Sequence, residues 1–209
     1  ELGALWAVKE LPLEKKREAK LLRLLNHQGL PRMMDYLEKE ENCYLVMEYI
    51  QGKNLEEWIK EGKSFSPEEI LRIGMETAEI LKYLHHCTPP VFYGDLKPGN
   101  LMLTESGRLY LIDFGSAVFW YGQEQNVCLG TKGYAAPEQY RGRITASSDI
   151  YALGKTLDSL MGKRKISYFI KCPEMFLVIK KCCMQKEGFR FRNAEEAEKR
   201  LSRILKDLK

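Results

Sequence analysis

Four polar side chains lie close together in the sequence between residues 95 and 113. Asp95, Lys97 and Asn100 share one loop, and Asp113 directly follows an apolar run. Apolar residues on both sides of the turn at 105–107 predict a β-hairpin that holds the two loops side by side. The set would combine a base-like carboxylate, a cation and two oxygen ligands for a hard divalent metal. These groups suit phosphoryl transfer, in which catalysis depends mostly on positioning and charge neutralisation.

The same stretch resembles a known family. D-L-K-P-x-N at 95–100 followed by D-F-G at 113–115 is similar to the catalytic loop and metal-binding motif of eukaryotic-like Ser/Thr protein kinases. A lone Asp-Phe-Gly is usually only a turn, but the combination is specific and the resemblance covers essentially the whole chain. It implies an α+β bilobal fold, with a small, truncated β-rich N-lobe (1–50) and a mainly helical C-lobe (51–209).

The resemblance also implies a role for each polar residue. Asp95 would orient the substrate hydroxyl and take its proton, and Lys97 would steady the transferred phosphoryl group. Asn100 and Asp113 would hold Mg²⁺, and Thr131 would hydrogen-bond Asp95 and Lys97. The implied cofactors are ATP and Mg²⁺, and the implied partner is a protein substrate carrying Ser or Thr.

Two earlier residues extend this set. Residues 5–9 alternate as a strand, which places Ala7 and Lys9 on one face, with space for a flat base beside the small side chain. A-V-K resembles the family's third-strand lysine motif. Glu18, on a helix predicted from 12 to 26, matches the carboxylate that pairs with this lysine. The alternatives are a solvent-facing Lys9 and a Glu18 that serves as an i,i+4 partner on the helix surface.

The adenine-binding segment is also identified by resemblance. A strand predicted over 43–50 leads into E-Y-I-Q-G, which is similar to the family's hinge. The backbone of Glu48 and Ile50 would then meet the adenine edge, with Met47 behind it, and Met102 would line the nucleotide pocket. Core packing is an alternative role for Met47, and both roles are compatible.

One departure from the family pattern concerns regulation. The usual His-Arg-Asp reads Tyr-Gly-Asp, and Gly94 cannot bind a phosphorylated activation loop as an arginine does. Between residues 116 and 130, the only hydroxyl residues are Ser116 and Tyr121. We therefore expect a loop that is not switched on by phosphorylation and that is ordered by packing of its aromatic residues.

Other motifs predict the scaffold of the C-lobe. Residues 130–138 resemble the peptide-docking loop and Ala-Pro-Glu motif, and the resemblance pairs Glu138 with Arg190. Asp149 matches a buried scaffold group. The sequence A-A-P-E-Q is more typical of bacterial members of the family. Only a short basic stretch, 162–172, stands where the family usually carries another helix, which suggests a minimal kinase used in bacterial signalling.

Composition excludes several classes of protein. The chain has 209 residues, a net charge of +4, and six cysteines without a C-x-x-C pair. Dispersed basic clusters favour solvated faces over nucleic-acid contacts, and the cysteines favour reduced, buried thiols in a cytoplasmic compartment. The absence of a long apolar run predicts no membrane segment in this chain. A sensor or regulatory domain could still be attached, including in a larger, membrane-anchored protein.

Two further functions are left open by the sequence. The glycine-rich lid G-x-G-x-x-G is absent, and we expect it upstream of the first residue. Its absence, together with Gly94, favours a pseudokinase that binds without turnover, whereas the complete set of catalytic groups favours chemistry. The sequence Y-G-D-L-K-P-G-N also resembles the corresponding loop of small-molecule phosphotransferases of the antibiotic or choline kinase type. The peptide-docking loop argues against that reading, since a small alcohol needs no such platform.

Overall fold

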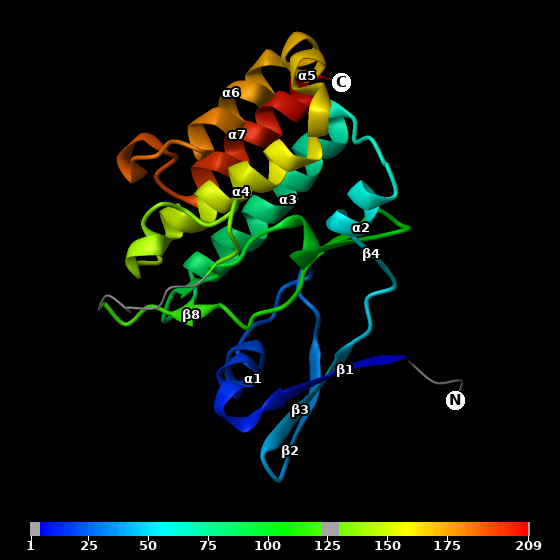
Figure 1. The fold of residues 1–209 in the computed structure, drawn as a ribbon, viewed down its shortest axis with the longest axis vertical. Coiled ribbons are helices and arrows are strands. Elements are labelled where there is room, and N and C mark those ends of the chain that lie inside the picture. The colour runs from blue at the N-terminus through cyan, green and yellow to red at the C-terminus, as the bar shows by residue number, and fades with distance from the viewer. Residues whose placement is uncertain (1–4, 123–129, 209) are drawn as a thin grey trace.

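The computed structural model describes residues 5–122 and 130–208, which form two regions of different architecture (Figure 1). At one end, β1 (Trp6–Pro12), β2 (Met33–Lys39) and β3 (Asn42–Glu48) form an antiparallel sheet in the order β1-β3-β2. The short helix α1 (Arg17–Leu22) lies beside this sheet. The other end is mainly helical. This arrangement confirms the predicted α+β fold, with a small β-rich N-lobe and a helical C-lobe.

The two faces of strand β1 differ in exposure, as the sequence alternation predicts. Ala7 and Lys9 are half-buried, whereas Trp6 and Val8 are exposed. In the sheet register, Ala7 lies opposite Met47 on the central strand β3. The strand therefore directs the Lys9 side chain away from solvent, toward the interior side that also contacts α1.

The predicted helix from 12 to 26 is wrong at both ends, because β1 is longer and α1 is shorter. The chain stays attached to the sheet after β1 because the Leu13 N–H donates to the carbonyl of Glu41 at 2.8 Å. A 3₁₀ turn then precedes α1. At the far end, the Leu24 N–H donates to the Leu21 carbonyl at 3.0 Å, an i→i−3 bond that tightens the last turn and ends the helix.

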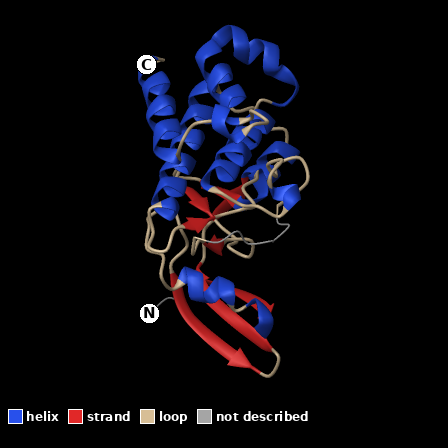
Figure 2. Cartoon of the chain, turned by 90° about the vertical axis from the view of Figure 1, so that its left-hand side faces the viewer, coloured by secondary structure: helices blue, strands red, loops and turns tan. Residues whose placement is uncertain are grey.

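Two small sheets lie between the N-lobe sheet and the helices (Figure 2). One has the order β4-β6-β7, and the other pairs β5 with β8. Their strands are β4 (Gly52–Asn54), β5 (Val91–Phe92), β6 (Leu101–Thr104), β7 (Leu109–Leu111) and β8 (Val118–Phe119). The hairpin predicted around 105–107 is confirmed, with Leu101 opposite Leu111 and Leu103 opposite Leu109. These four leucines are buried and anchor the hairpin in the core.

The helical region is organised around α3, which packs against α7 and α4. Its helices are α2 (Leu55–Lys60), α3 (Pro67–His85), α4 (Ala146–Leu160), α5 (Lys165–Lys171), α6 (Pro173–Cys182) and α7 (Ala194–Asp207). Single 3₁₀ turns occupy Leu13–Lys15, Pro98–Asn100, Gln139–Arg141, Gly162–Arg164 and Glu187–Phe189. Side chains cap three of these helices at their N-termini: Asn54 and Ser66 form capping boxes, and Asn193 accepts from the Glu196 N–H.

Helix α5 corrects another expectation. The stretch from 162 to 172 is not merely a basic connection, because most of it is helical. Tyr168 is buried, and its hydroxyl donates to the Phe65 carbonyl. Ile166 and Ile170 are largely exposed, however. The helix therefore lacks the continuous buried stripe from which a sequence pattern could identify it.

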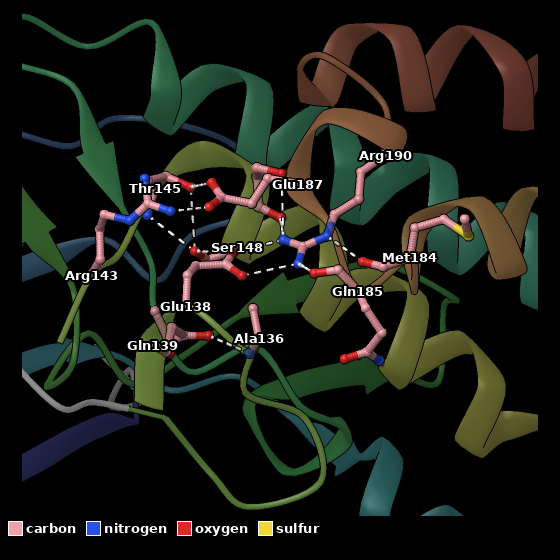
Figure 3. A network of polar contacts seen from close by, with 12 residues as sticks. Ala136, Glu138, Gln139, Arg143, Thr145, Ser148, Met184, Gln185, Glu187 and Arg190 are labelled. Carbon is pink, nitrogen blue, oxygen red and sulfur yellow. Dashed lines mark hydrogen bonds and ion pairs between the residues drawn. The ribbon is translucent and has the colours of Figure 1, made fainter. Parts of the chain in front are cut away.

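A buried ion pair between Arg190 and Glu138 connects two segments of the C-lobe (Figure 3). Arg190 binds Glu138 through two parallel hydrogen bonds of 2.6 and 2.9 Å, as the resemblance predicted. Its remaining donors contact the carbonyls of Met184, Ser147 and Gln185. Because every donor group of the guanidinium is satisfied and its side chain is fully buried, this contact is structural.

The composition predicts reduced, buried thiols. The five cysteines among residues 5–122 and 130–208 are free thiols, and Cys43, Cys172 and Cys182 are buried. Within these ranges no cluster of three or more His, Cys, Asp and Glu residues could hold a metal ion. No helix in the described part of the chain has both the length and the apolarity needed to cross a membrane.

Candidate active site

The two lobes meet at a triad of charged side chains. Lys9 on β1 donates to both carboxylate oxygens of Glu18 on α1, at 2.8 and 2.9 Å. The same ammonium donates to Asp113 Oδ1, beyond the end of β7, at 2.8 Å. The predicted contact between Lys9 and Glu18 is therefore present. The Phe114 N–H also donates to Glu18, at 3.1 Å, so the carboxylate on α1 binds both the lysine and the D-F-G backbone.

Opposite charges govern the ionisation of this triad. Burial acts to lower the pKa of Lys9, but hydrogen bonds and charges from Asp113 and Glu18 outweigh it and raise that pKa above its ordinary value. Burial acts to raise the pKa of Asp113, but Lys9 outweighs it and lowers that pKa. Glu18 is only 4% exposed, and a carboxylate this buried requires a cationic partner. Lys9 and Asp113 are thus charged together at neutral pH.

The backbone around Asp113 has an unusual conformation. Its φ of +62° lies in the left-handed region, which a non-glycine residue adopts at a cost. The Gly115 N–H donates to Asp113 Oδ1 at 3.2 Å. The buried Tyr93 hydroxyl lies within hydrogen-bond distance of the carbonyls of Ile112 and Asp113, and its ring packs edge-on against Phe114. These contacts fix the direction in which the Asp113 carboxylate points.

A second polar cluster forms around Asp95. Its carboxylate accepts from Lys97 at 2.8 Å, and from the Thr131 N–H and hydroxyl at 2.8 and 2.7 Å. Lys97 also donates to the Thr131 hydroxyl oxygen at 2.8 Å. Asn100 donates to the Asp95 carbonyl at 2.9 Å. The contacts of Thr131 with Asp95 and Lys97 are those that the resemblance predicted. The 3₁₀ turn at 98–100 brings Asn100 back to Asp95.

The backbone of the catalytic loop is held by a carboxylate from the helical core. Asp149 on α4 is buried and accepts from the Tyr93 N–H at 2.9 Å and the Gly94 N–H at 2.8 Å. It also contacts His85 Nε2 at 2.9 Å. The prediction that Asp149 is a buried scaffold group is confirmed. Nothing in the local sequence around His85 indicates a partner on α4.

Gln139 is a further positioning residue that the sequence did not identify. Its amide nitrogen donates to the Gly94 carbonyl at 2.7 Å, and its amide oxygen accepts from the Ala136 N–H at 2.8 Å. Gly94 has a φ of +79°, and a Cβ there would lie 3.0 Å from the Ser116 carbonyl oxygen. A glycine therefore fits this position for a steric reason, beyond the missing arginine.

The metal-ligand candidates fit Mg²⁺ in part. Because the Asn100 amide nitrogen donates to Asp95, its amide oxygen remains an acceptor, and half of the Asp113 side chain is exposed. Mg²⁺ commonly takes one or two protein oxygens and completes its shell with water and substrate phosphates. The lack of a larger acidic cluster among the described residues agrees with that mode, in which the nucleotide supplies the other ligands.

The residues predicted to contact the nucleotide lie around the connection between the lobes. Ala7 and Met47 are register partners on β1 and β3, and Met47 packs against the core. Glu48 ends β3, and its N–H donates to the Arg32 carbonyl at 2.8 Å. Ile50 is buried, and its N–H has no hydrogen-bond partner among the described residues.

Met102 approaches the same region from the C-lobe. It is half-buried on β6, where it lies opposite Asn54 of β4 and Tyr110 of β7. Within the described ranges, no side-chain hydrogen bond or ion pair joins Lys9, Glu18 or Asp113 to Asp95 or Lys97. The positive charge of Lys97 nevertheless lowers the pKa of Asp113, after the larger effect of Lys9, so the two clusters share one electrostatic field.

Comparisons with known proteins agree with this geometry. The family model described as protein kinase domain matches residues 3–208. The chain is 37% identical over 162 residues to serine/threonine-protein kinase B of Synechocystis sp. (71% of this chain, 28% of that protein). It is 33% identical over 153 residues to serine/threonine-protein kinase PrkC of Bacillus subtilis (71% and 23%). It is 35% identical over 162 residues to a probable LRR receptor-like serine/threonine-protein kinase of Arabidopsis thaliana (73% and 18%).

These matches cover less than a third of the length of each of the three relatives. Within that region, the family assignment agrees with the bilobal fold and with the polar clusters around Asp95 and Asp113. The chain therefore belongs to the protein kinase domain family, among the eukaryotic-like serine/threonine kinases.

Proposed function

We propose that this chain is an ATP- and Mg²⁺-dependent kinase domain that phosphorylates Ser or Thr in proteins. The observation that carries the proposal is the Lys9 ammonium, which contacts Glu18 and Asp113 from opposite lobes. A protein that served only as a scaffold would not need both charged groups on one lysine. The names of the relatives, all serine/threonine-protein kinases, support the same activity.

Each polar residue has a defined part in the proposed reaction. Asp95 orients the acceptor hydroxyl and takes its proton, while Lys97 balances charge on the transferred group. Lys9, held by Glu18, binds nucleotide phosphates. A bound Mg²⁺ would neutralise phosphate charge, and Asp113 is one of the residues that would hold the ion. Since Asp113 Oδ1 now accepts from Lys9, nucleotide binding has to weaken this contact.

Asn100 and Thr131 complete the proposed assignment. Asn100 is the second residue that would hold Mg²⁺, through its amide oxygen. Thr131 keeps the Asp95 carboxylate and the Lys97 ammonium in register, because it bonds to both. Ala7, Met47 and Met102 enclose the base, and the backbone of Glu48 and Ile50 reads its edge. The Ile50 N–H, which has no hydrogen-bond partner within residues 5–122 and 130–208, is the donor that such a contact needs.

Regulation is part of the same proposal. Gly94 offers no cation to a phosphate on the activation segment, so we infer that phosphorylation of that segment does not switch the kinase on. We place the domain in the cytoplasm, with a sensor or regulatory domain attached in a longer protein. Relatives that carry the words receptor-like in their names fit this arrangement.

The test is transfer of labelled phosphate from ATP to a generic Ser/Thr protein acceptor in a single turnover. Wild type is compared with Asp95→Asn, and with Asp35→Asn as a control on the exposed strand β2. We expect transfer to fall at least about a hundredfold in Asp95→Asn and to stay unchanged in Asp35→Asn. Equal signals in all three proteins would favour the pseudokinase. Faster labelling of small alcohols than of peptides would favour the small-molecule phosphotransferase.

A further inference from the structure

A cavity of about 300 Å³ lies between α1 and the chain that follows β8. It is outside the polar clusters already described. Its walls combine charged residues from the start of the α1 region with two aromatic rings from the activation segment. The lining residues are Glu14, Lys16, Arg17, Lys20, Phe119 and Tyr121. The cavity therefore joins the N-lobe helix to a segment that continues from the C-lobe strand β8.

The charges around this cavity are unbalanced. Three of the lining side chains are cationic and one, Glu14, is anionic, which leaves an excess of two positive charges. Arg17 and Lys20 form no ion pair with any described residue, and Lys16 has only a long contact of 3.9 Å with Glu38. This concentration of unpaired positive charge favours an anion.

Tyr121 supplies a neutral hydrogen-bond donor to the same space. Its ring packs against Phe119, with 6.1 Å between ring centroids, and 71% of the residue is exposed. A guanidinium, an ammonium and a phenol hydroxyl are together the donor set that recognises a tetrahedral oxyanion. We propose that this cavity binds a phosphate group from outside the chain, with Arg17 and Lys20 as its cationic contacts and Tyr121 as a hydrogen-bond donor.

Binding there would act on the helix that carries Glu18. Arg17 precedes Glu18 directly in α1, and Glu18 holds Lys9. A phosphate held between α1 and Tyr121 therefore fixes α1 in the position that the Lys9 contact requires. The ligand would thus join the helix to the activation segment without the arginine that Gly94 replaces. The binding itself does not depend on phosphotransfer, so it can be measured whether or not the proposed activity is correct.

The test is calorimetric titration of inorganic phosphate into the protein at constant ionic strength, with chloride as the reference salt. The test variant is Arg17→Gln with Lys20→Gln. Arg23→Gln is the matched control, because Arg23 is an exposed cation at the end of the same helix and does not line the cavity. Lys9→Gln removes phosphate binding in the catalytic cleft. Tyr121→Phe removes only the hydroxyl.

We expect saturable binding that weakens at least about tenfold in the double variant and a few-fold in Tyr121→Phe. Arg23→Gln should bind as wild type does. Lys9→Gln should keep saturable binding, weakened less than in the double variant, because Lys9 holds α1 through Glu18 but does not line the cavity. Loss of binding in Lys9→Gln, equal binding in wild type and the double variant, or no saturable binding of any phosphate probe would each overturn the proposal. If the double variant does not fold by circular dichroism, the two single variants decide the same question.

A second titration distinguishes the sources of the phosphate. Short peptides containing phosphoserine or phosphothreonine are compared with inorganic phosphate and with unphosphorylated peptides. Tighter binding of phosphopeptides, dependent on Arg17 and Lys20, supports a phosphorylated partner. Tighter binding of inorganic phosphate supports a free ion. Equal binding of phosphorylated and unphosphorylated peptides, with no response to inorganic phosphate, would contradict a phosphate site.

Discussion

Lys9 Nζ lies 2.8 Å from Glu18 Oε1 and 2.8 Å from Asp113 Oδ1, so one ammonium group joins the N-lobe helix to the end of β7. The two carboxylates are separated by 95 residues in sequence, and neither has another lysine or arginine within ion-pair distance among the described residues. The stability of the interface between the lobes and the proposed binding of nucleotide phosphates therefore depend on the same side chain.

Replacing this lysine should weaken the fold as well as the proposed activity. In Lys9→Gln the nearly buried carboxylate of Glu18 loses its cation, and we expect the free energy of unfolding to fall by about 1–3 kcal/mol. Urea titration measures the change. Lys39→Gln, on an exposed position of β2, is the control and should change stability by less than about 0.5 kcal/mol. Equal effects of both variants would contradict the interaction.

The same contact predicts a pH dependence of stability. The pKa of Asp113 is lowered in the folded state, so its contribution is present above the ordinary value of 3.8 and is lost as pH falls through the folded pKa. The pKa of Lys9 is raised, so its contribution is present below the ordinary value of 10.5 and is lost as pH rises through the folded pKa. Unfolding profiles of Lys9→Gln should be flatter than wild type on both limbs. Parallel profiles would show that the pair does not titrate with folding.

The buried pair between Arg190 and Glu138 should be far more sensitive than a surface pair nearby. We expect Glu138→Gln to cost about 3–5 kcal/mol, because the Arg190 charge remains in a site without solvent. Arg192→Gln serves as the control, since its side chain is 90% exposed and pairs with Glu196 on the surface. Thermal unfolding followed by circular dichroism compares the two. A loss below 1 kcal/mol for Glu138→Gln would mean that the pair is not structurally important.

Gly94 should resist replacement for reasons of backbone geometry. Its φ of +79° and the close Ser116 carbonyl predict that Gly94→Ala destabilises the fold by about 1–2 kcal/mol. Gly188→Ala is the matched control, because open space surrounds that position and its φ is not positive. Differential scanning calorimetry of the two variants tests the difference. An unchanged Gly94→Ala would show that the loop adapts.

Thr131 offers a test of how Asp95 is positioned. In Thr131→Ala the carboxylate loses a hydroxyl donor, and Lys97 loses an acceptor, so we expect the catalytic constant to fall about tenfold or more. Thr131→Ser keeps the hydroxyl and should restore most of the rate, while the Michaelis constant for ATP stays the same in all three proteins. Failure of serine to restore the rate would assign Thr131 a packing role instead.

Local signals in the sequence predicted the hairpin, the helix caps and the partners of Lys97. These features depend on neighbours in sequence, such as Ser66 and Glu69 of the α3 capping box, or on motifs with fixed spacing. The lengths of the helices could be predicted less well. The end of α1 is decided by i→i−3 bonds around Leu24, and α5 is held by Tyr168 without a buried stripe.

The contacts that were hardest to predict from the sequence are those made by polar side chains across the C-lobe. His85 and Gln139 appear unremarkable in sequence, yet one contacts Asp149 on another helix and the other holds the Gly94 carbonyl. No periodicity indicates such partners. The packing of α3 against α4 brings His85 to Asp149, and the 3₁₀ turn at 139–141 brings Gln139 to Gly94. The cationic cavity beside Tyr121 is similar, since the basic residues of α1 read as a solvated surface until the activation segment is placed next to them.

The two hydrogen bonds from Tyr93 and Gly94 to Asp149 have a consequence for the kinetics of hydrogen exchange. An amide in an ordinary surface loop exchanges through small local openings, but these two amides are tied to a carboxylate on α4, inside the helical core. Their exchange requires α4 to separate from the loop. The proposed catalytic residue next to them, Asp95, is therefore held in place by the helical core.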